Sequence, residues 1–485
     1  MSELYKWQII SFLSRMAAMV IGIVQTFFII NIISKADYGV VQIALAIGGT
    51  YGIYQHLGLA SGSTREIASA KDDTEVFKIF TTATVIRYFV TIPIAIFIYL
   101  RAPYWAFESY NEPQLLLPLR LFAFALLFQG MQSMLNSIIS GTKRFKHLFL
   151  YQALISFVSI GLYIPLVYIY GLNGYFYAFT AFNIIATLSL SVIALKPLRA
   201  SIELPSREDF KRLLKQLFSI TLAIYAVKVI LTVWEKTGPR VLPFVVSAEL
   251  VAVFSVALLY GKKLMNISDS VTDVNLPVFS EKYASNLQEF KSEFVSNFNK
   301  LFVLTIFTAV GAVFWSQEVF HIVFQEVNYD EALPLVAPLV FTFIFYSFVN
   351  ILKSSILVPA RLVFELIAGF VALLGVTYGF YYYFLHTIGP LNAMAYGMLA
   401  GALAGFFVIL VGSQNKLSFS YFGFWHALLL LFGAFFSFYT ISTVFFTKLL
   451  VFFVFCALYV CFVIYSKFVS YSDIKKLLLL LNKFR

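Results

Sequence analysis

The sequence predicts an all-α, polytopic membrane protein with about fourteen transmembrane helices. Of its 485 residues, 60% are hydrophobic and only 12% are charged, against roughly 45–50% and about 25% in ordinary soluble domains. Apolar runs of about 20 residues, the length at which a helix crosses roughly 30 Å of hydrocarbon, recur from end to end. Because these runs lack the alternation of barrel strands, we expect them to be helices.

The first apolar run, SFLSRMAAMVIGIVQTFFIINII at 11–33, is too long for a signal-peptide core. No small-residue cleavage site follows it, so we expect it to remain as the first span. The short connections leave no room for a separate soluble domain. In chain order, we expect spans at 9–33, 38–60, 78–100, 115–140, 148–170, 173–195, 215–235, 245–267, 298–317, 333–357, 362–386, 390–412, 423–445 and 448–468.

The basic residues indicate the orientation of these spans. Most of those near span ends fall on one side, in the connections 65–78, 143–146 and 196–215 and in the tail after 467. The positive-inside rule makes this side cytoplasmic, so both termini are expected in the cytoplasm. The net charge of +11 then reflects topology and attraction to anionic lipids, and requires no nucleic-acid partner. The few basic residues expected outside are Lys35, Arg101, Lys236, Arg240 and Lys448.

The segment SIELPSREDFKRLLKQLF at 201–218 connects the two halves of the predicted span pattern. Ser206 followed by Asp209 resembles a capping box, and a basic face and the apolar residues Leu213, Leu214 and Leu217 follow. This pattern predicts an amphipathic helix at the membrane interface.

Segments about 212–218 residues apart are weakly similar and occur in the same order. SKADYGVVQIAL at Ser34 matches SAELVAVFSVAL at Ser247, and YGLNGYFYAF at 170–179 matches IGPLNAMAYG at 388–397. Ser133 and Asn136 likewise return as Ser347 and Asn350. We infer two six-helix halves related by a parallel repeat. The predicted organisation is a first lobe at 1–200, a linker at 201–214, a second lobe at 215–412, and two additional helices with a basic tail at 413–485.

These segments, together with the basic loop SGTKRFKHLFLYQ and the sequence AELVAVFSVALLYGKKLMNISDSV, carry a resemblance to a known family. The chain resembles the polysaccharide-transporter branch of the multidrug/oligosaccharidyl-lipid/polysaccharide (MOP) exporter superfamily, which includes Wzx-like O-antigen flippases. The resemblance covers essentially the whole chain. It implies two lobes in a V around a central cavity, and alternating access. It also implies transfer of a polyprenyl-diphosphate-linked oligosaccharide from the cytoplasmic to the outer leaflet of the plasma membrane, for surface polysaccharide or lipopolysaccharide synthesis.

The distribution of charge inside the spans gives independent evidence about the substrate. None of the 24 acidic residues falls inside the six predicted spans of the first half. A cation buried in the membrane costs a few kcal/mol, so unpaired ones are expected to face a watery cavity or to bind an anion. The planar guanidinium of arginine can donate two hydrogen bonds to phosphate oxygens, and the lysine ammonium group acts as a point charge. A mixture of the two therefore suits a diphosphate. The candidate substrate-binding residues are Arg15, Arg87 and Arg120 in the first half, and Lys228 and Lys353 in the second.

Each of these cations also has an ordinary structural explanation. Arg120 lies near the outer end of its span and could snorkel to the interface. Arg15 and Arg87 lie roughly 10–13 Å inside their cytoplasmic ends at 1.5 Å per residue, which a long side chain can nearly reach. Lys228 is the deepest cation and the hardest to explain as a topology signal.

Several other classes compete with a flippase of this kind. A MATE-like drug or cation antiporter should carry carboxylates inside its spans, and the first half has none. A major-facilitator transporter is disfavoured because GLASGSTREIASAKDD at 58–73 lacks that family's loop motif. A membrane polymerase or glycosyltransferase usually has a large outer loop or a catalytic acidic pair. The absence of a GxxxxGK[ST] loop argues against ATP coupling in this chain. A lipid II flippase shares the fold and the need for a basic cavity.

The sequence therefore predicts translocation rather than enzymatic chemistry. The five histidines are scattered without metal-ligand spacing, and Cys456 and Cys461 are the only cysteines, so we expect no cofactor and no metal. The expected partners are the lipid-linked oligosaccharide and anionic membrane lipids. Other polysaccharide assembly proteins are candidate partners.

Overall fold

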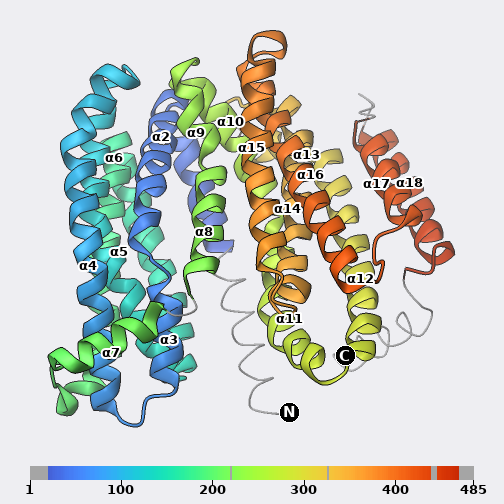
Figure 1. Cartoon of the computed structure of the whole chain (residues 1–485). Coiled ribbons are helices and arrows are strands. Elements are labelled where there is room, and N and C mark those ends of the chain that lie inside the picture. Colours follow the sequence, from blue (N-terminus) through green and yellow to red (C-terminus); the bar gives the residue numbers. More distant parts are fainter. Residues whose placement is uncertain (1–19, 219–220, 325–326, 439–444, 469–485) are drawn as a thin grey trace, which may run out of the picture. The chain divides into compact units, whose positions relative to one another are not determined.

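The computed structural model describes residues 20–218, 221–324, 327–438 and 445–468. These residues form helices and contain no strand (Figure 1). The predicted all-α fold is therefore confirmed. Arg15 and the beginning of the first predicted span, up to residue 19, lie outside the described residues.

Eight helices in the described part of the chain are long and apolar enough to cross a membrane. Two shorter apolar helices cover Val20–Ile32 and Phe424–Ser437. The predicted spans at 38–60, 215–235 and 245–267 correspond to helices of 15 to 18 residues. The protein is thus a multi-pass membrane protein, and the count of fourteen spans stays a prediction.

The chain divides into two compact units. The first contains Met1–Ser255 and Val323–Asn328. Within it, α4, α5 and the two halves of α6 lie side by side (Figure 1). Its helices are α2 (Lys35–Gly52), α3 (Leu59–Ala68), α4 (Asp73–Pro103), α5 (Leu116–Gly141), α6 (Phe145–Leu195), α7 (Arg207–Phe218), α8 (Thr221–Glu235), α9 (Thr237–Val241) and the beginning of α10 (Ala248–Lys262).

The second unit contains Val256–Ile322 and Tyr329–Arg485. The division falls inside α10, whereas the lobe boundaries predicted from the repeat stay a prediction. The unit's further helices are α11 (Met265–Ser285), α12 (Leu287–Phe314), α13 (Ser316–Val323), α14 (Leu333–Leu352), α15 (Val363–Ile388), α16 (Pro390–Leu417), α17 (Phe424–Phe438) and α18 (Phe445–Tyr465).

Two glycines produce the hairpin in the middle of α6. Gly171 adopts φ +55° and ψ −131°, so the helical path breaks there. A Cβ on Gly174 would lie 1.9 Å from the carbonyl oxygen of Leu166, so only glycine allows this approach. Side chains then meet across the hairpin, with the rings of Tyr163 and Tyr175 5.1 Å apart. The turn predicted from YGLNGYFYAF is confirmed, and its repeat counterpart has Gly389 at φ +82° between α15 and α16.

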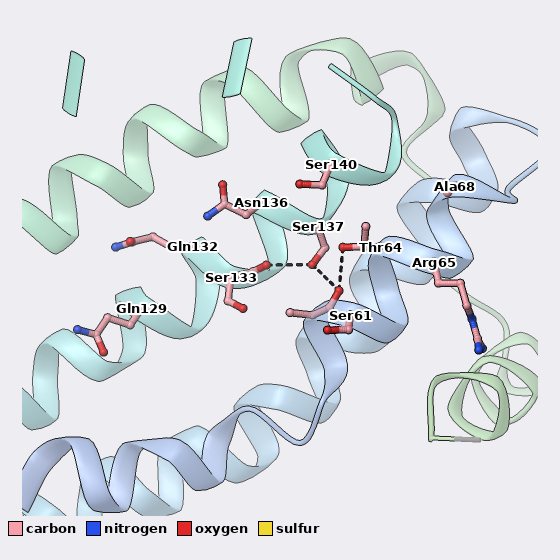
Figure 2. Close-up of a pocket in the computed structure, with 11 residues that line it drawn as sticks. Ser61, Thr64, Arg65, Ala68, Gln129, Gln132, Ser133, Asn136, Ser137 and Ser140 are labelled. Carbon is pink, nitrogen blue, oxygen red and sulfur yellow. Dashed lines mark hydrogen bonds between the residues drawn. The ribbon is translucent and has the colours of Figure 1, made fainter. Parts of the chain in front are cut away.

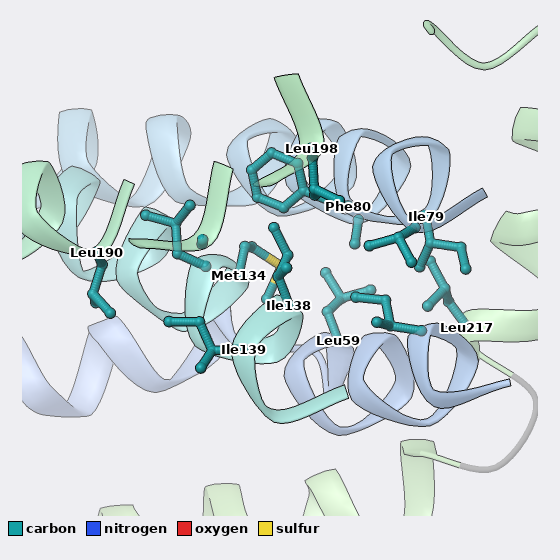
Figure 3. Close-up of a cluster of buried hydrophobic side chains, with 14 of the residues drawn as sticks. Leu59, Ile79, Phe80, Met134, Ile138, Ile139, Leu190, Leu198 and Leu217 are labelled. Carbon is teal, nitrogen blue, oxygen red and sulfur yellow. The ribbon is translucent and has the colours of Figure 1, made fainter. Parts of the chain in front are cut away.

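A hydrophobic cluster fixes α7 to the first unit. Leu59 of α3, Phe80 of α4 and Ile138 of α5 pack in this cluster with Leu213 and Leu217 of α7 (Figure 3). Because Leu213 and Leu217 are four residues apart, they lie on one face of the helix. The predicted amphipathic helix at 201–218 is therefore present and is docked on protein.

Polar contacts hold the beginning of α7. The backbone N–H of Asp209 donates to the Ser206 hydroxyl at 3.1 Å, and the Ser206 N–H donates to the Asp209 carboxylate at 3.4 Å. The predicted capping box is thus confirmed. Lys78 of α4 pairs with Glu203 at 2.6 Å and with Asp209 at 3.4 Å. The hydrogen bonds with Ser206, followed by the charge of Lys78, lower the pKa of Asp209.

Aromatic packing dominates the second unit. Phe290, Phe294, Phe298 and Phe302 follow one another at every fourth position of α12, and each is fully or almost fully buried. Neighbouring rings in this row are 5.8 to 6.3 Å apart. The four-residue spacing places them on one face, so α12 packs into this unit through a row of buried aromatic rings.

Candidate substrate site in the first unit

A break between α2 and α3 creates the centre of the candidate site. The predicted span at 38–60 was wrong as a continuous helix, because α2 ends at Gly52 and α3 begins at Leu59. Between them, Leu57 and Gly58 have φ +44° and +72°, which interrupts the helical path. The break brings the polar side chains of Gln55 and His56 against α4, where they meet Thr91 and Arg87.

Arg87 of α4 is the central cation of this site. Its side chain is 0% exposed. One terminal nitrogen, Nη1, donates to the Ser133 hydroxyl of α5 at 3.2 Å, and the other, Nη2, lies 3.1 Å from Nδ1 of His56. A guanidinium can only donate, so Nδ1 of His56 must accept and the imidazole is neutral. Nε of Arg87 is buried and has no hydrogen-bond partner among the described residues.

Lys228 of α8 lies near this cluster. Its ammonium group is exposed and interacts electrostatically with Arg87 and His56. Helix α8 is held at the break by the Tyr225 hydroxyl, which lies 3.1 Å from the backbone oxygen of Tyr54. Two cations from distant parts of the sequence are therefore close enough to act on one ligand.

No carboxylate in the described part of the chain lies within 4 Å of Arg87 or Lys228. The hydrogen-bond partners of Arg87 are neutral, and they do not balance its charge. A buried cation of this kind is expensive in a membrane protein unless an anion or water compensates it. The arrangement can thus bind an anion, and the guanidinium geometry suits phosphate oxygens.

A cavity of about 730 Å³ lies next to Arg87, between α3 and α5. Ser133 lines this cavity and also accepts the hydrogen bond from Arg87, so the guanidinium is one hydrogen bond away from the cavity. Figure 2 shows Ser61 and Thr64 of α3 beside Ser137 of α5, with the other polar side chains of α5 spread along that helix. The lining consists of Ala60, Ser61, Thr64, Arg65, Ala68, Gln129, Gln132, Ser133, Asn136, Ser137 and Ser140.

Of the five predicted site residues, the structure brings together Arg87 and Lys228. Arg120 lies in the second turn of α5, where its guanidinium stacks 5.0 Å from the centre of the Tyr99 ring. It does not line the cavity. Lys353 begins a π-helical turn at Lys353–Leu357 in the second unit and is partly buried. The role of each of the five residues in substrate binding stays a prediction.

Sequence reasoning missed His56 and the cavity. No other metal-ligating residue follows or precedes His56 at the spacing of a metal site, so the surrounding sequence does not mark His56 as a site residue. The cavity did leave a signal, because Gln129, Gln132, Ser133, Asn136 and Ser140 recur every three or four residues. That spacing places five polar side chains on one face of an otherwise apolar helix. Of these, only Ser133 and Asn136 were noted, as markers of the repeat.

Solved structures share this fold at low sequence identity. An inward-facing multidrug resistance MATE family transporter of the MOP superfamily matches with a TM-score of 0.68 at 16% identity, over 83% of this chain and 94% of that one. The lipid II flippase MurJ, in an inward closed conformation, matches with a TM-score of 0.66 at 15% identity, over 95% and 98%. The fold is therefore that of MOP superfamily membrane transporters.

The family comparison is more specific. The family described as "Polysaccharide biosynthesis protein" matches residues 30–334, and the chain belongs to this family. No curated protein gives a match. Family and fold together confirm the resemblance to the polysaccharide branch of the MOP superfamily, and they support a membrane flippase or exporter.

Proposed function

We propose that the protein is a flippase that moves a polyprenyl-diphosphate-linked oligosaccharide from the cytoplasmic to the outer leaflet of the plasma membrane, with both of its termini in the cytoplasm. The reaction is translocation, without bond making or breaking. The membership in a polysaccharide biosynthesis family supports this proposal. The lipid tail stays in the bilayer, the diphosphate lies at the cations of the first unit, and the sugars occupy aqueous space.

The observation that carries the proposal is the buried, charge-unbalanced Arg87. A diphosphate would supply the missing negative charge and would accept the donors of its guanidinium. Lys228 would add a second charge that can move with the ligand, because its side chain is exposed. Arg15, Arg120 and Lys353 are proposed to contribute further positive charge along the path.

The test is replacement of Arg87 and Lys228 in cells that depend on this gene. We expect Arg87→Gln and Lys228→Gln each to reduce export by roughly 10-fold or more, the effect of losing one charged hydrogen bond of about 1.5–3 kcal/mol. Arg87→Lys should be intermediate, since it keeps the charge and loses the fork. The measurement is mass spectrometry of lipid-linked sugars accumulating on the inner leaflet, at matched protein levels.

Arg101→Gln is the matched control. Arg101 is an exposed arginine of the same helix, α4, and it stacks on the ring of Tyr104. We expect full export from this variant. The identity of the accumulated lipid also separates an oligosaccharide flippase from a lipid II flippase. Full export by both Arg87→Gln and Lys228→Gln would contradict the proposed diphosphate site.

A further inference from the structure

We propose that the cavity between α3 and α5 binds the sugar adjacent to the diphosphate, and that it selects sugars bearing hydroxyl and amide groups without net charge. This inference rests on the proposed function and adds a substrate specificity to it. Its support comes from the chemistry of the lining, from the hydrogen-bonding capacity left unused there, and from the position of the cavity beside Arg87.

Most residues of the lining have neutral polar side chains. Eight of the eleven lining residues are Ser, Thr, Asn or Gln, two are Ala and one is Arg65. The guanidinium of Arg65 is bound by Glu66 at 2.6 Å, and it also reaches the backbone oxygen of Gln216 at 3.4 Å, so its charge is compensated. The lining contains neither a carboxylate nor an aromatic ring. A site for an organic cation would require one of these groups.

Unused hydrogen-bonding capacity remains in the cavity. Gln132 directs its amide nitrogen toward Asn183 and Thr187 at 3.0 to 3.2 Å, which leaves its amide oxygen as an acceptor. The side-chain oxygen of Asn136 is buried and has no partner among the described residues. Buried acceptors are normally satisfied, and the hydroxyl groups of a sugar are suitable donors.

Ser133 connects the cavity to the cation. Because its oxygen accepts from Arg87, its own hydroxyl proton remains free to donate. Sugar hydroxyls and an N-acetyl carbonyl can accept such a hydrogen bond. A phosphate at Arg87 and a sugar in the cavity would therefore be neighbours, as they are in a sugar diphosphate. The volume of about 730 Å³ lies within the roughly 300–1,000 Å³ of ordinary small-molecule sites.

The experiment measures binding to the purified full-length protein in nanodiscs. The probes are inorganic phosphate, N-acetylglucosamine 1-phosphate, glucosamine 1-phosphate and glucuronic acid 1-phosphate. We expect N-acetylglucosamine 1-phosphate to bind at least tenfold more tightly than phosphate. Glucosamine 1-phosphate and glucuronic acid 1-phosphate, which carry an extra charge on the sugar, should gain little over phosphate.

Two variants locate the effect in the cavity. Asn136→Leu should reduce the advantage of N-acetylglucosamine 1-phosphate over phosphate by about threefold to tenfold, as expected for one hydrogen bond. Asn136→Asp is nearly isosteric, which guards against a folding defect, and it should shift the preference toward glucosamine 1-phosphate. Gln114→Leu, at an exposed amide outside the cavity, is the control. It should change neither the affinity for phosphate nor the affinity for N-acetylglucosamine 1-phosphate.

The outcomes separate the two proposals. If phosphate binds but the N-acetylated sugar adds no affinity, or adds as much in Asn136→Leu and Asn136→Asp as in the parent protein, the sugar site is wrong and the flippase proposal stands. If no phosphate compound binds and both Arg87→Gln and Lys228→Gln export normally in cells, the proposed diphosphate site is wrong, and the sugar site fails with it.

Discussion

At the residue scale, the candidate site is centred on Arg87, whose guanidinium contacts Ser133 and His56. Arg87 and Lys228 can be selected from sequence, because a cation deep in an apolar span stands out without structural information. His56 cannot be selected, because its importance comes from the break after Gly52, which brings its ring to Arg87. Such long-range contacts depend on packing between helices, which local sequence patterns do not encode.

The bond between Arg87 and His56 predicts a linkage between anion and proton. While Arg87 donates to Nδ1, protonation of His56 would place two cations 3.1 Å apart. A bound anion would draw the donors of Arg87 toward itself and favour the protonated ring. Anion binding should then take up a proton, so affinity should rise as pH falls. We expect sulfate to bind more tightly at pH 5 than at pH 7.

Sulfate is a suitable probe for this linkage because it does not titrate in that pH range. Isothermal titration calorimetry in buffers of different ionisation enthalpy would report the proton uptake directly. His56→Gln should bind sulfate with little dependence on pH, whereas His147→Gln, at an exposed histidine, should behave as the parent protein does. Equal pH dependence in His56→Gln and the parent would contradict the linkage.

At the element scale, local signals predict more of the structure. The capping box of α7 and the glycine turn of α6 are encoded in a few adjacent residues, and both are confirmed. The ion pairs of Lys78 with Glu203 and with Asp209 of α7 join residues more than a hundred positions apart, and no local pattern predicts them. The end of α2 at Gly52 was missed, since an apolar run does not show where a helix stops.

The two leucines of α7 provide a matched stability test. Leu217 is 0% exposed in the hydrophobic cluster, and Leu214 is 36% exposed. We expect Leu217→Ala to lower the free energy of unfolding by about 2–5 kcal/mol. Leu214→Ala should change it by less than about 0.5 kcal/mol. Thermal unfolding of the detergent-solubilised protein measures both. Equal effects would show that α7 is not fixed by its buried face.

At the scale of the whole molecule, composition alone predicts a helical membrane protein, because burying the backbone in lipid leaves few other folds. Weak motifs in a fixed order predict the family, and the match of residues 30–334 to that family confirms the prediction. The compact units are less predictable. Contacts assign α8, α9 and the beginning of α10 to the first unit, although the repeat pattern assigns them to the second half.

The orientation in the membrane can be tested with two single cysteines on opposite ends of α4. Glu208 lies in α7, which packs at the first turns of α4, and Gln114 follows the end of α4. Both are exposed. In a background without Cys456 and Cys461, an impermeant thiol reagent added to intact cells should label Gln114→Cys and leave Glu208→Cys unlabelled. The opposite result would reverse the predicted topology.

A transporter must release its substrate as readily as it binds it. The hydrogen-bond partners of Arg87 in the ligand-free protein affect how tightly the substrate is held. Ser133 and His56 occupy two of its five N–H donors before any ligand arrives, so an anion that uses these donors must displace them. This competition weakens binding of the cargo and leaves the guanidinium hydrogen-bonded when the carrier is empty. Loss of both partners should therefore produce a protein that holds its cargo longer and turns over more slowly.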